Sequence, residues 1–163
     1  MTSPERRPRY DEDNADRVAV ICLGNRYMKD DGIGVRVAEE LTNGQHGVVA
    51  DAFHSLDLAQ LANYSSASRI IIVDALKGGG RPGTVSRYSI VPGTDPIESM
   101  PGAHAMKLHE IIGIARRMKI LSCPVDVVGV EPKDCSPGEG LTEELERAVP
   151  DVCAVVYKEL GIG

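Results

Sequence analysis

Two carboxylates and one imidazole stand at positions where α/β proteins bind ligands. Asp31 precedes a predicted amphipathic helix, Asp74 ends an apolar run, and His104 lies where a loop enters a long helix. Carboxylate oxygens with an imidazole nitrogen suit nickel, zinc, manganese or iron without distinguishing among them. Water or a substrate could fill the remaining coordination positions. These residue types therefore predict a site for a divalent metal, which can act as a Lewis acid or activate a water.

Each of these residues also has a structural interpretation. Asp is among the commonest residues at helix N-termini, so Asp30 or Asp31 can be a helix cap. Asp74 can accept hydrogen bonds from N–H groups of its own loop. His104, taken alone, is more often a cap or a surface residue than a ligand. The residue types leave both interpretations open. The positions of these residues relative to the predicted strands and helices are needed to choose between them.

The hydrophobic pattern predicts alternating strands and helices. Strands are expected at residues 18–23, 48–50, 70–73, 84–90 and 125–130, and helices at 33–43, 56–64, 104–119 and from 143 onward, with a cap at Thr142 and a kink or restart at Pro150. The fold class is therefore predicted as single-domain α/β, a three-layer α/β/α sandwich with a mostly parallel, twisted sheet of about five strands, of which one edge strand can be antiparallel. Ligands of such sheets bind beyond the carboxyl ends of the strands, where Asp31, Asp74 and His104 are expected.

Length and composition limit the classes of protein to consider. The 163 residues suit one domain, with residues 1–16 as a polar, flexible tail and residues 17–163 as the α/β domain. A net charge of −6 and an aromatic content of 4% argue against a nucleic-acid partner. Without an apolar run of about 20 residues or a signal-like N-terminus, the chain is predicted to have no membrane segment and to be cytoplasmic. The four cysteines lack paired metal or redox spacing and are predicted to be reduced and structural.

Several familiar motifs are missing from this sequence. No Gly-x-Gly-x-x-Gly follows the first predicted strand, and no glycine cluster leads into Gly-Lys-Ser or Gly-Lys-Thr, so nucleotide binding has no support. His109-Glu110 begins like a zincin motif, but Gly113 occupies the position of its second histidine. No Gly-x-Ser-x-Gly is present. Zincin and serine-hydrolase mechanisms are therefore not predicted.

The segment from Gly24 to Gly34 resembles the Gly-Asn-x4-Asp-Asp/Glu-Gly-x-Gly signature of the hydrogenase maturation endopeptidases, the processing proteases of [NiFe] hydrogenases. Residues 72–75 with 82–84, 104–108, and 128–132 with 140–142 resemble further segments of that family. The resemblance therefore covers nearly all of residues 18–160. It implies a supporting turn that contains Gly24, Asn25, Asp30, Gly32 and Gly34.

The resemblance also implies which residues form the site. In that family the nickel ligands are the second acid of the Asp-Asp/Glu pair, the Asp of a Val-Asp-Ala segment and the motif histidine, which correspond here to Asp31, Asp74 and His104. These three residues would be both metal ligands and catalytic residues, and Asp30 would keep the helix-capping role. The implied function is an endopeptidase that removes the C-terminal extension of a [NiFe]-hydrogenase large-subunit precursor. The implied partner is the nickel-loaded precursor, which would supply the Ni²⁺, although other divalent metals can occupy such a site.

Two departures from the family pattern leave the identity of the processed hydrogenase open. The chain has Asp51-Ala52-Phe53-His54 where the family usually has an Asp-Gly-Gly-Thr-like turn, and Pro101-Gly102-Ala103 where a Ser or Thr commonly precedes the histidine. His54 either approaches the site or lies on the surface, which is the commoner position for a loop histidine. Alternatives to the main hypothesis are a related α/β peptidase that acts on another precursor, such as a germination-type protease, and a non-catalytic metal-binding scaffold protein of maturation.

Overall fold

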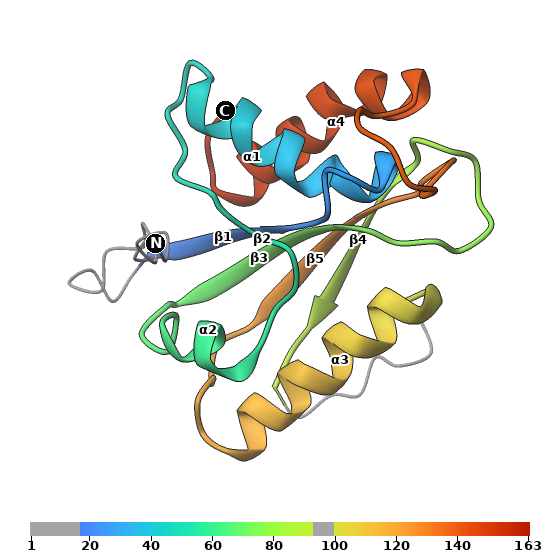
Figure 1. Ribbon diagram of the computed structural model, residues 1–163. Helices are drawn as coiled ribbons and strands as arrows, with labels where there is room; N and C mark the ends of the chain where they lie inside the picture. The colour runs from blue at the N-terminus through green and yellow to red at the C-terminus, as the bar shows by residue number, and fades with distance from the viewer. Residues whose placement is uncertain (1–16, 93–99) are drawn as a thin grey trace, which may run out of the picture.

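Five strands form one twisted sheet. In the computed structural model, which describes residues 17–92 and 100–163, the strands are β1 (Val18–Leu23), β2 (Asp51–Phe53), β3 (Arg69–Ala75), β4 (Val85–Ile90) and β5 (Val125–Val130) (Figure 1). Their order in the sheet is β2-β1-β3-β5-β4. Neighbouring strands pair in parallel except for β4, which runs antiparallel to β5 at the edge. The predicted, mostly parallel sheet with one antiparallel edge strand is confirmed.

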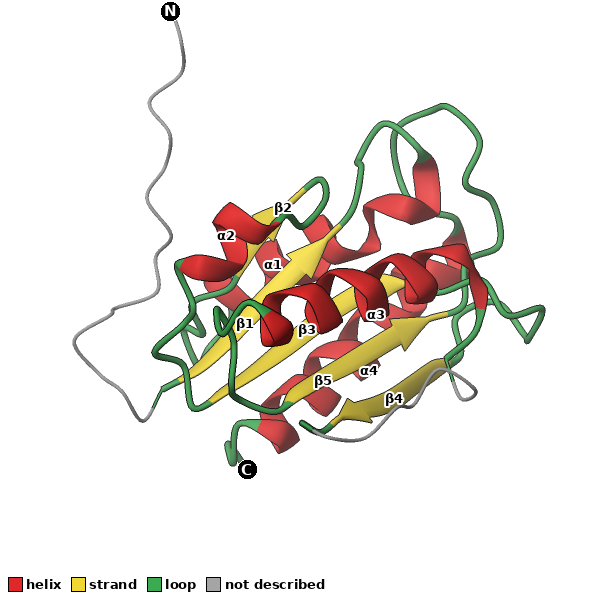
Figure 2. Cartoon of the chain, turned by 90° about the horizontal axis from the view of Figure 1, so that it is seen from below, coloured by secondary structure: helices red, strands yellow, loops and turns green. Residues whose placement is uncertain are grey.

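Helices cover both faces of this sheet. They are α1 (Ile33–Asn43), α2 (Leu58–Ala62), α3 (Gly102–Arg117) and α4 (Glu143–Glu159), and a short 3₁₀ helix, η1 (Lys29–Gly32), leads into α1. Helices α1 and α4 lie on one face, and α2 and α3 lie on the other (Figures 1 and 2). This arrangement confirms the predicted three-layer sandwich. Among residues 17–92 and 100–163, none of the helices combines the length and the hydropathy that a membrane span requires.

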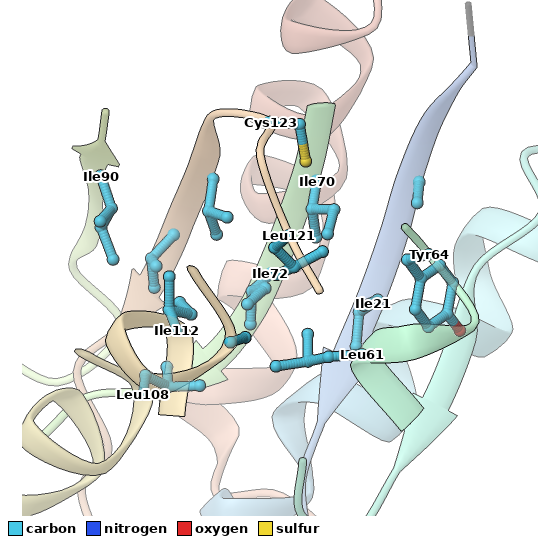
Figure 3. Close-up of a cluster of buried hydrophobic side chains, with 14 of the residues drawn as sticks. Ile21, Leu61, Tyr64, Ile70, Ile72, Ile90, Leu108, Ile112, Leu121 and Cys123 are labelled. Atoms are coloured by element: carbon cyan, nitrogen blue, oxygen red, sulfur yellow. The ribbon is translucent and has the colours of Figure 1, made fainter. Parts of the chain in front are cut away.

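The strands alternate their side chains between two apolar cores. In β3, Ile70 and Ile72 pack with α2 and α3 in the cluster of Figure 3, whereas Ile71 and Val73 pack with α1 and α4. All four side chains are fully buried, which explains why β3 is apolar without interruption. Because successive side chains of a strand point to opposite faces, Asp74 projects to the same face as Ile70 and Ile72. The strand thus directs Asp74 toward the layer that contains α3.

The second strand lies three residues beyond its predicted position. The sequence pattern predicts residues 48–50, whereas β2 comprises Asp51–Phe53 and pairs with the carboxyl half of β1. The backbone N–H of Val48 donates to the carbonyl of Leu41, so this stretch completes the end of α1 rather than the sheet. The predicted position of this strand is therefore wrong, and the difference places His54 directly after β2.

The last helix runs through Pro150 without a restart. A kink or restart is predicted there because proline removes a helical hydrogen bond. The restart is wrong, because α4 is continuous from Glu143 to Glu159. Val149 and Val152 are buried on either side of Pro150, so packing against the sheet holds the helix together across it. Thr142 occupies the predicted N-cap position, although its side chain makes no capping hydrogen bond to α4.

The four cysteines are free, as predicted. Three of them are buried in the two cores, whereas Cys135 is exposed on the loop after β5 and is not a core residue. The tail predicted for residues 1–16 lies outside the described residues, as does most of the loop predicted for residues 92–101.

Candidate functional site

The three predicted site residues meet at the carboxyl end of the sheet. Helices α1 and α2 lie on opposite faces, so a crevice is expected between the ends of β1 and β3, where the strand order changes direction (Figure 1). Asp31 lies in η1 after β1, and Asp74 is the penultimate residue of β3. His104 lies in the first turn of α3, on the face toward which Asp74 projects.

The side chains of these residues form one cluster. The Nδ1 atom of His104 lies 3.6 Å from Oδ2 of Asp74 and 3.8 Å from Oδ1 of Asp31. One ligand atom from each residue can be chosen so that all three lie within 4.8 Å of one another. Two atoms that bind one ion at about 2 Å must lie within about 4 Å of each other, so both His104 distances fit a shared cation. Two carboxylates and one imidazole also suit a borderline metal such as Ni²⁺.

Burial and charge give the three residues different ionisation behaviour. The side chain of Asp74 is 7% exposed, that of Asp31 18% and that of His104 48%. Burial raises the pKa of Asp74, and the interaction with His104 offsets part of this effect. The Asp74 carboxylate raises the pKa of His104, against an opposing effect of burial. Because a metal binds the neutral imidazole, its affinity for the cluster is expected to increase with pH.

Asp74 differs from the other buried carboxylates of residues 17–92 and 100–163. Asp126, at the opposite end of the sheet, pairs with two arginines. Asp30 accepts hydrogen bonds from backbone N–H groups and a hydroxyl. Asp74 instead has the half-exposed imidazole of His104 as its cationic partner. A buried carboxylate whose cationic partner is half exposed is costly to ionise, and such groups are concentrated at functional sites.

The turn after β1 positions Asp31. The backbone N–H of Asn25 donates to the Asp31 carboxylate at 3.1 Å and to the Asp31 carbonyl at 3.2 Å. The side chain of Asn25 accepts a hydrogen bond from the N–H of Tyr27, which fixes the turn locally. Gly24 and Gly32 pack against the backbone of the same turn, and a Cβ on Gly24 would lie 2.2 Å from the Asp31 carbonyl oxygen. The turn therefore closes tightly around Asp31.

Asp30 does not cap α1, so the capping role predicted for it is wrong. The N-cap of α1 is Gly32, and no side chain caps that helix. Asp30 is fully buried and accepts hydrogen bonds of 2.7 to 2.9 Å from the backbone N–H groups of Lys133, Asp134 and Thr142. The Thr142 hydroxyl also donates to it. Asp30 therefore ties η1 to the loop after β5 and to the start of α4.

The first turn of α3, which carries His104, is held against the loop after β3. The carboxylate of Glu131 accepts hydrogen bonds from the N–H groups of Gly78 at 2.9 Å and Gly79 at 3.1 Å in that loop. Gly102 has a φ of +88°, and a Cβ there would lie 2.5 Å from a carbonyl oxygen of the same loop. This close approach accounts for a glycine at one of the positions that depart from the family pattern.

A cavity of about 240 Å³ opens beside the cluster, and all three residues line it. His54 and Lys107 also line it. The structure thus answers a question that the sequence leaves open, because it brings His54 to the cavity of the candidate site. The signal that could have identified His54 is its position directly after β2, which corresponds to that of Asp74 at the end of β3.

Sequence comparisons relate the chain to proteins of hydrogenase maturation. The sequence profile of the family described as hydrogenase maturation protease matches residues 35–159. The hydrogenase expression/formation protein HupD of Bradyrhizobium diazoefficiens is 31% identical over an alignment that covers 95% of this chain and 84% of that protein. The hydrogenase 2 maturation protease of Escherichia coli is 28% identical, and the alignment covers 82% of this chain and 84% of that protein.

Solved structures share the fold. The hydrogenase 2 maturation peptidase from Thaumarchaeota archaeon SCGC_AB-539-E09 aligns with a TM-score of 0.67 and 27% identity over 91% of this chain and 100% of that chain. The [NiFe] hydrogenase maturation protease HybD from Thermococcus kodakarensis aligns with a TM-score of 0.68 and 27% identity over 87% of this chain and 97% of that chain. Fold and sequence together define a peptidase of the α/β/α type. The chain belongs to the hydrogenase maturation protease family, which confirms the resemblance.

Proposed function

We propose that this protease removes the C-terminal extension of a [NiFe]-hydrogenase large-subunit precursor after nickel has been inserted. The observation that carries the proposal is the cluster of Asp31, Asp74 and His104 within 4.8 Å. Three protein ligands leave coordination positions open, so the cluster suits a metal that another protein already holds. Nickel is then part of the substrate. We place the reaction in the cytoplasm, in keeping with the four free cysteines.

The residues of the cluster have distinct roles in this proposal. Asp31, Asp74 and His104 would ligate the nickel of the precursor and so hold the neighbouring peptide bond at the edge of the sheet. The nickel can polarise the scissile carbonyl or lower the pKa of a bound water. Asp74, whose pKa is raised by burial, is a better proton acceptor than an exposed carboxylate. Recognition and catalysis would therefore share one metal.

Cleavage should depend on nickel in the precursor. The full-length protein is incubated with the same large-subunit precursor, either nickel-loaded or nickel-free, and the mass of the precursor is measured before and after. We expect the extension to be lost from the nickel-loaded form alone. Equal cleavage of both forms would favour a related peptidase that does not recognise the metal. A complex with the nickel-loaded form whose mass never changes would favour the non-catalytic scaffold.

Glu131→Ala is expected to slow precursor cleavage by about 10- to 100-fold, as is typical when the support of a metal-binding residue is lost. Without this carboxylate, the N–H groups of Gly78 and Gly79 lose their acceptor, and the loop no longer fixes the first turn of α3. These hydrogen bonds are exposed, so the free energy of unfolding should fall by only about 1 kcal/mol.

Cleavage rates and urea unfolding curves of the variants check this prediction. Glu131→Gln keeps one carbonyl acceptor and should give an intermediate rate. A Glu131→Ala variant that cleaves as fast as the wild type would show that Glu131 does not help to position His104.

A further inference from the structure

Strand β2 has an unpaired edge. It is the last strand of the sheet on its side and pairs with β1 alone (Figure 2). The carbonyl of Phe53 accepts a hydrogen bond of 3.0 Å from the N–H of Gly24, so Phe53 faces β1. The backbone groups of a strand alternate in direction, and the N–H and C=O of Ala52 therefore point away from β1. Among residues 17–92 and 100–163, no group hydrogen-bonds to either of them. We call this side of β2 the outer edge.

The outer edge leads into the candidate site. His54, directly after β2, lines the cavity of the cluster. A strand added to the outer edge would lie two strand spacings, about 10 Å, from β1. One extended residue spans about 3.3 Å, so about three residues of peptide connect the cluster to this edge. The opposite side of the sheet is farther from the cluster, because β4 is separated from β3 by β5.

We propose that the C-terminal extension of the precursor pairs with the outer edge as an added strand, antiparallel to β2, and that one extension residue exchanges two hydrogen bonds with Ala52. The inference rests on the proposed function, because it takes the cleaved bond to lie at the cluster. To that function it adds the part of the precursor that is recognised and the backbone groups that recognise it.

The position of the site determines the direction of the added strand. The cluster lies at the carboxyl ends of the strands, and the extension begins at the cleaved bond. It therefore runs from the carboxyl end of β2 toward its amino end, which is the antiparallel direction. In an antiparallel pair, two opposite residues exchange both of their hydrogen bonds, so one extension residue satisfies both free groups of Ala52. Because the extension ends in a free terminus, it can lie along the edge without a connection back to the precursor.

The surroundings of the outer edge suit a peptide recognised through its backbone. Ala52 is small and exposed, so its side chain does not obstruct an incoming strand. Val49, two residues before β2, is 47% exposed, and a strand running toward the amino end of β2 passes it and covers apolar surface. Such strand addition gains its affinity from main-chain hydrogen bonds. Since β2 has three residues and only Ala52 points outward, the contact is small, which suits an extension that must leave after cleavage.

Methylation of single backbone nitrogens of the extension tests this pairing. Nickel-loaded precursors are prepared with an N-methyl group on one amide of the extension at a time. With the wild-type protease, methylation at one position, about the third to fifth residue after the cleaved bond, should block the pair with Ala52. KM should then rise about tenfold with kcat unchanged, because the lost hydrogen bonds are remote from the reacting atoms. Methylation of the two neighbouring amides, which point away from β2, should change KM less than about twofold.

Ala52→Pro removes the outward N–H from the protease itself. Proline is tolerated on an edge strand when its nitrogen faces away from the sheet, and Asp51 before it has the extended backbone that proline requires. This variant should raise KM for the unmodified precursor about tenfold, and methylation of the sensitive amide should have no further effect. The matched comparison is Ala52→Val, which changes the side chain and keeps the N–H. It should retain the roughly tenfold ratio of KM between methylated and unmodified precursor.

The possible outcomes separate the inference from the proposed function. A wild-type KM that no methylation changes, or one that consecutive methylations raise equally, overturns the inference alone. An Ala52→Pro variant with the methylation ratio of the wild type also overturns it. If urea unfolding shows that Ala52→Pro does not fold, the methylation pattern of the wild type decides. If the wild type cleaves no nickel-loaded precursor, the proposed function fails and the inference fails with it.

Discussion

Asp74→Asn is expected to slow precursor cleavage by about 10³-fold or more, which corresponds to about 4 kcal/mol of transition-state stabilisation. Asparagine has nearly the same shape as aspartate but carries no charge, so the cluster loses a charged oxygen ligand and its most buried proton acceptor. The variant also loses the carboxylate that raises the pKa of His104. Single-turnover cleavage of the nickel-loaded precursor, followed by mass, measures the effect.

The same substitution is not expected to destabilise the fold. Burial raises the pKa of Asp74, so the folded chain binds a proton at this carboxyl group more tightly than the unfolded chain does. The contribution of such a group to stability is complete below the ordinary carboxyl pKa and is lost as the pH rises through the raised value. Above this raised value, the ionised Asp74 therefore opposes folding. The unfolding temperature of Asp74→Asn should equal or exceed that of the wild type.

The control for this substitution is Asp151→Asn, at an exposed position of α4, which should cleave at the wild-type rate. Asp31→Asn and His104→Ala should slow cleavage about as much as Asp74→Asn does, since each variant changes one of the three residues that offer a ligand atom to the metal. Normal cleavage by all three site variants would overturn the assignment of the site.

Gly34→Ala is expected to lower the free energy of unfolding by about 3 kcal/mol or more, which is the upper range for overpacking. A Cβ at this position would lie 2.0 Å from the carbonyl oxygen of Leu23 and 2.8 Å from its nitrogen. Both atoms belong to the backbone of β1, so no side chain can rotate away to make room. Helix α1 would have to move off the sheet, and Asp31 in the preceding turn would move with it. Urea unfolding and precursor cleavage should both reveal the change.

Gly113→Ala separates this steric effect from helix propensity. Gly113 lies inside α3, and a Cβ there would meet no atom within 4 Å apart from its chain neighbours and the backbone of its own helix. Alanine is favoured over glycine within helices, so this variant should gain about 0.5–1 kcal/mol. If Gly34→Ala had the same urea midpoint as the wild type, the close approach of α1 to β1 would not constrain the fold.

The fold was predictable where burial dictates residue type. Strands β1 and β3 are covered on both faces, so their sequences are continuously apolar and their positions follow from the sequence. Strand β2 has no buried residue, and its three residues carry little hydrophobic signal. Ala50, which is apolar and buried, lies just before β2. Its apolar character placed the predicted strand too early in the sequence, next to the end of α1. The position of this strand is decided by pairing with β1, which the local sequence does not encode.

The site was predictable in part for a related reason. Asp31 and Asp74 follow apolar strands of a parallel sheet, and this topology brings such residues to one edge. The role of Asp30 was not predictable, because its hydrogen-bond partners lie more than 100 residues away in the sequence. For His54, the misplaced second strand hid its position at the same edge. In both cases the missing information is the long-range pairing of segments, to which hydrophobic periodicity is insensitive.

The buried Asp30 carboxylate bears on the thermodynamics of precursor binding. Its hydrogen bonds hold η1, the loop after β5 and the start of α4 in one arrangement before any precursor arrives. Ordering a flexible loop on binding would cost about 1–2 kcal/mol of conformational entropy for each residue fixed. Because Asp31 follows Asp30 directly, that entropy is already lost when the chain folds. The affinity for the precursor is therefore not reduced by ordering this turn, and an enzyme with a loosened Asp30 would bind more weakly through the same ligands.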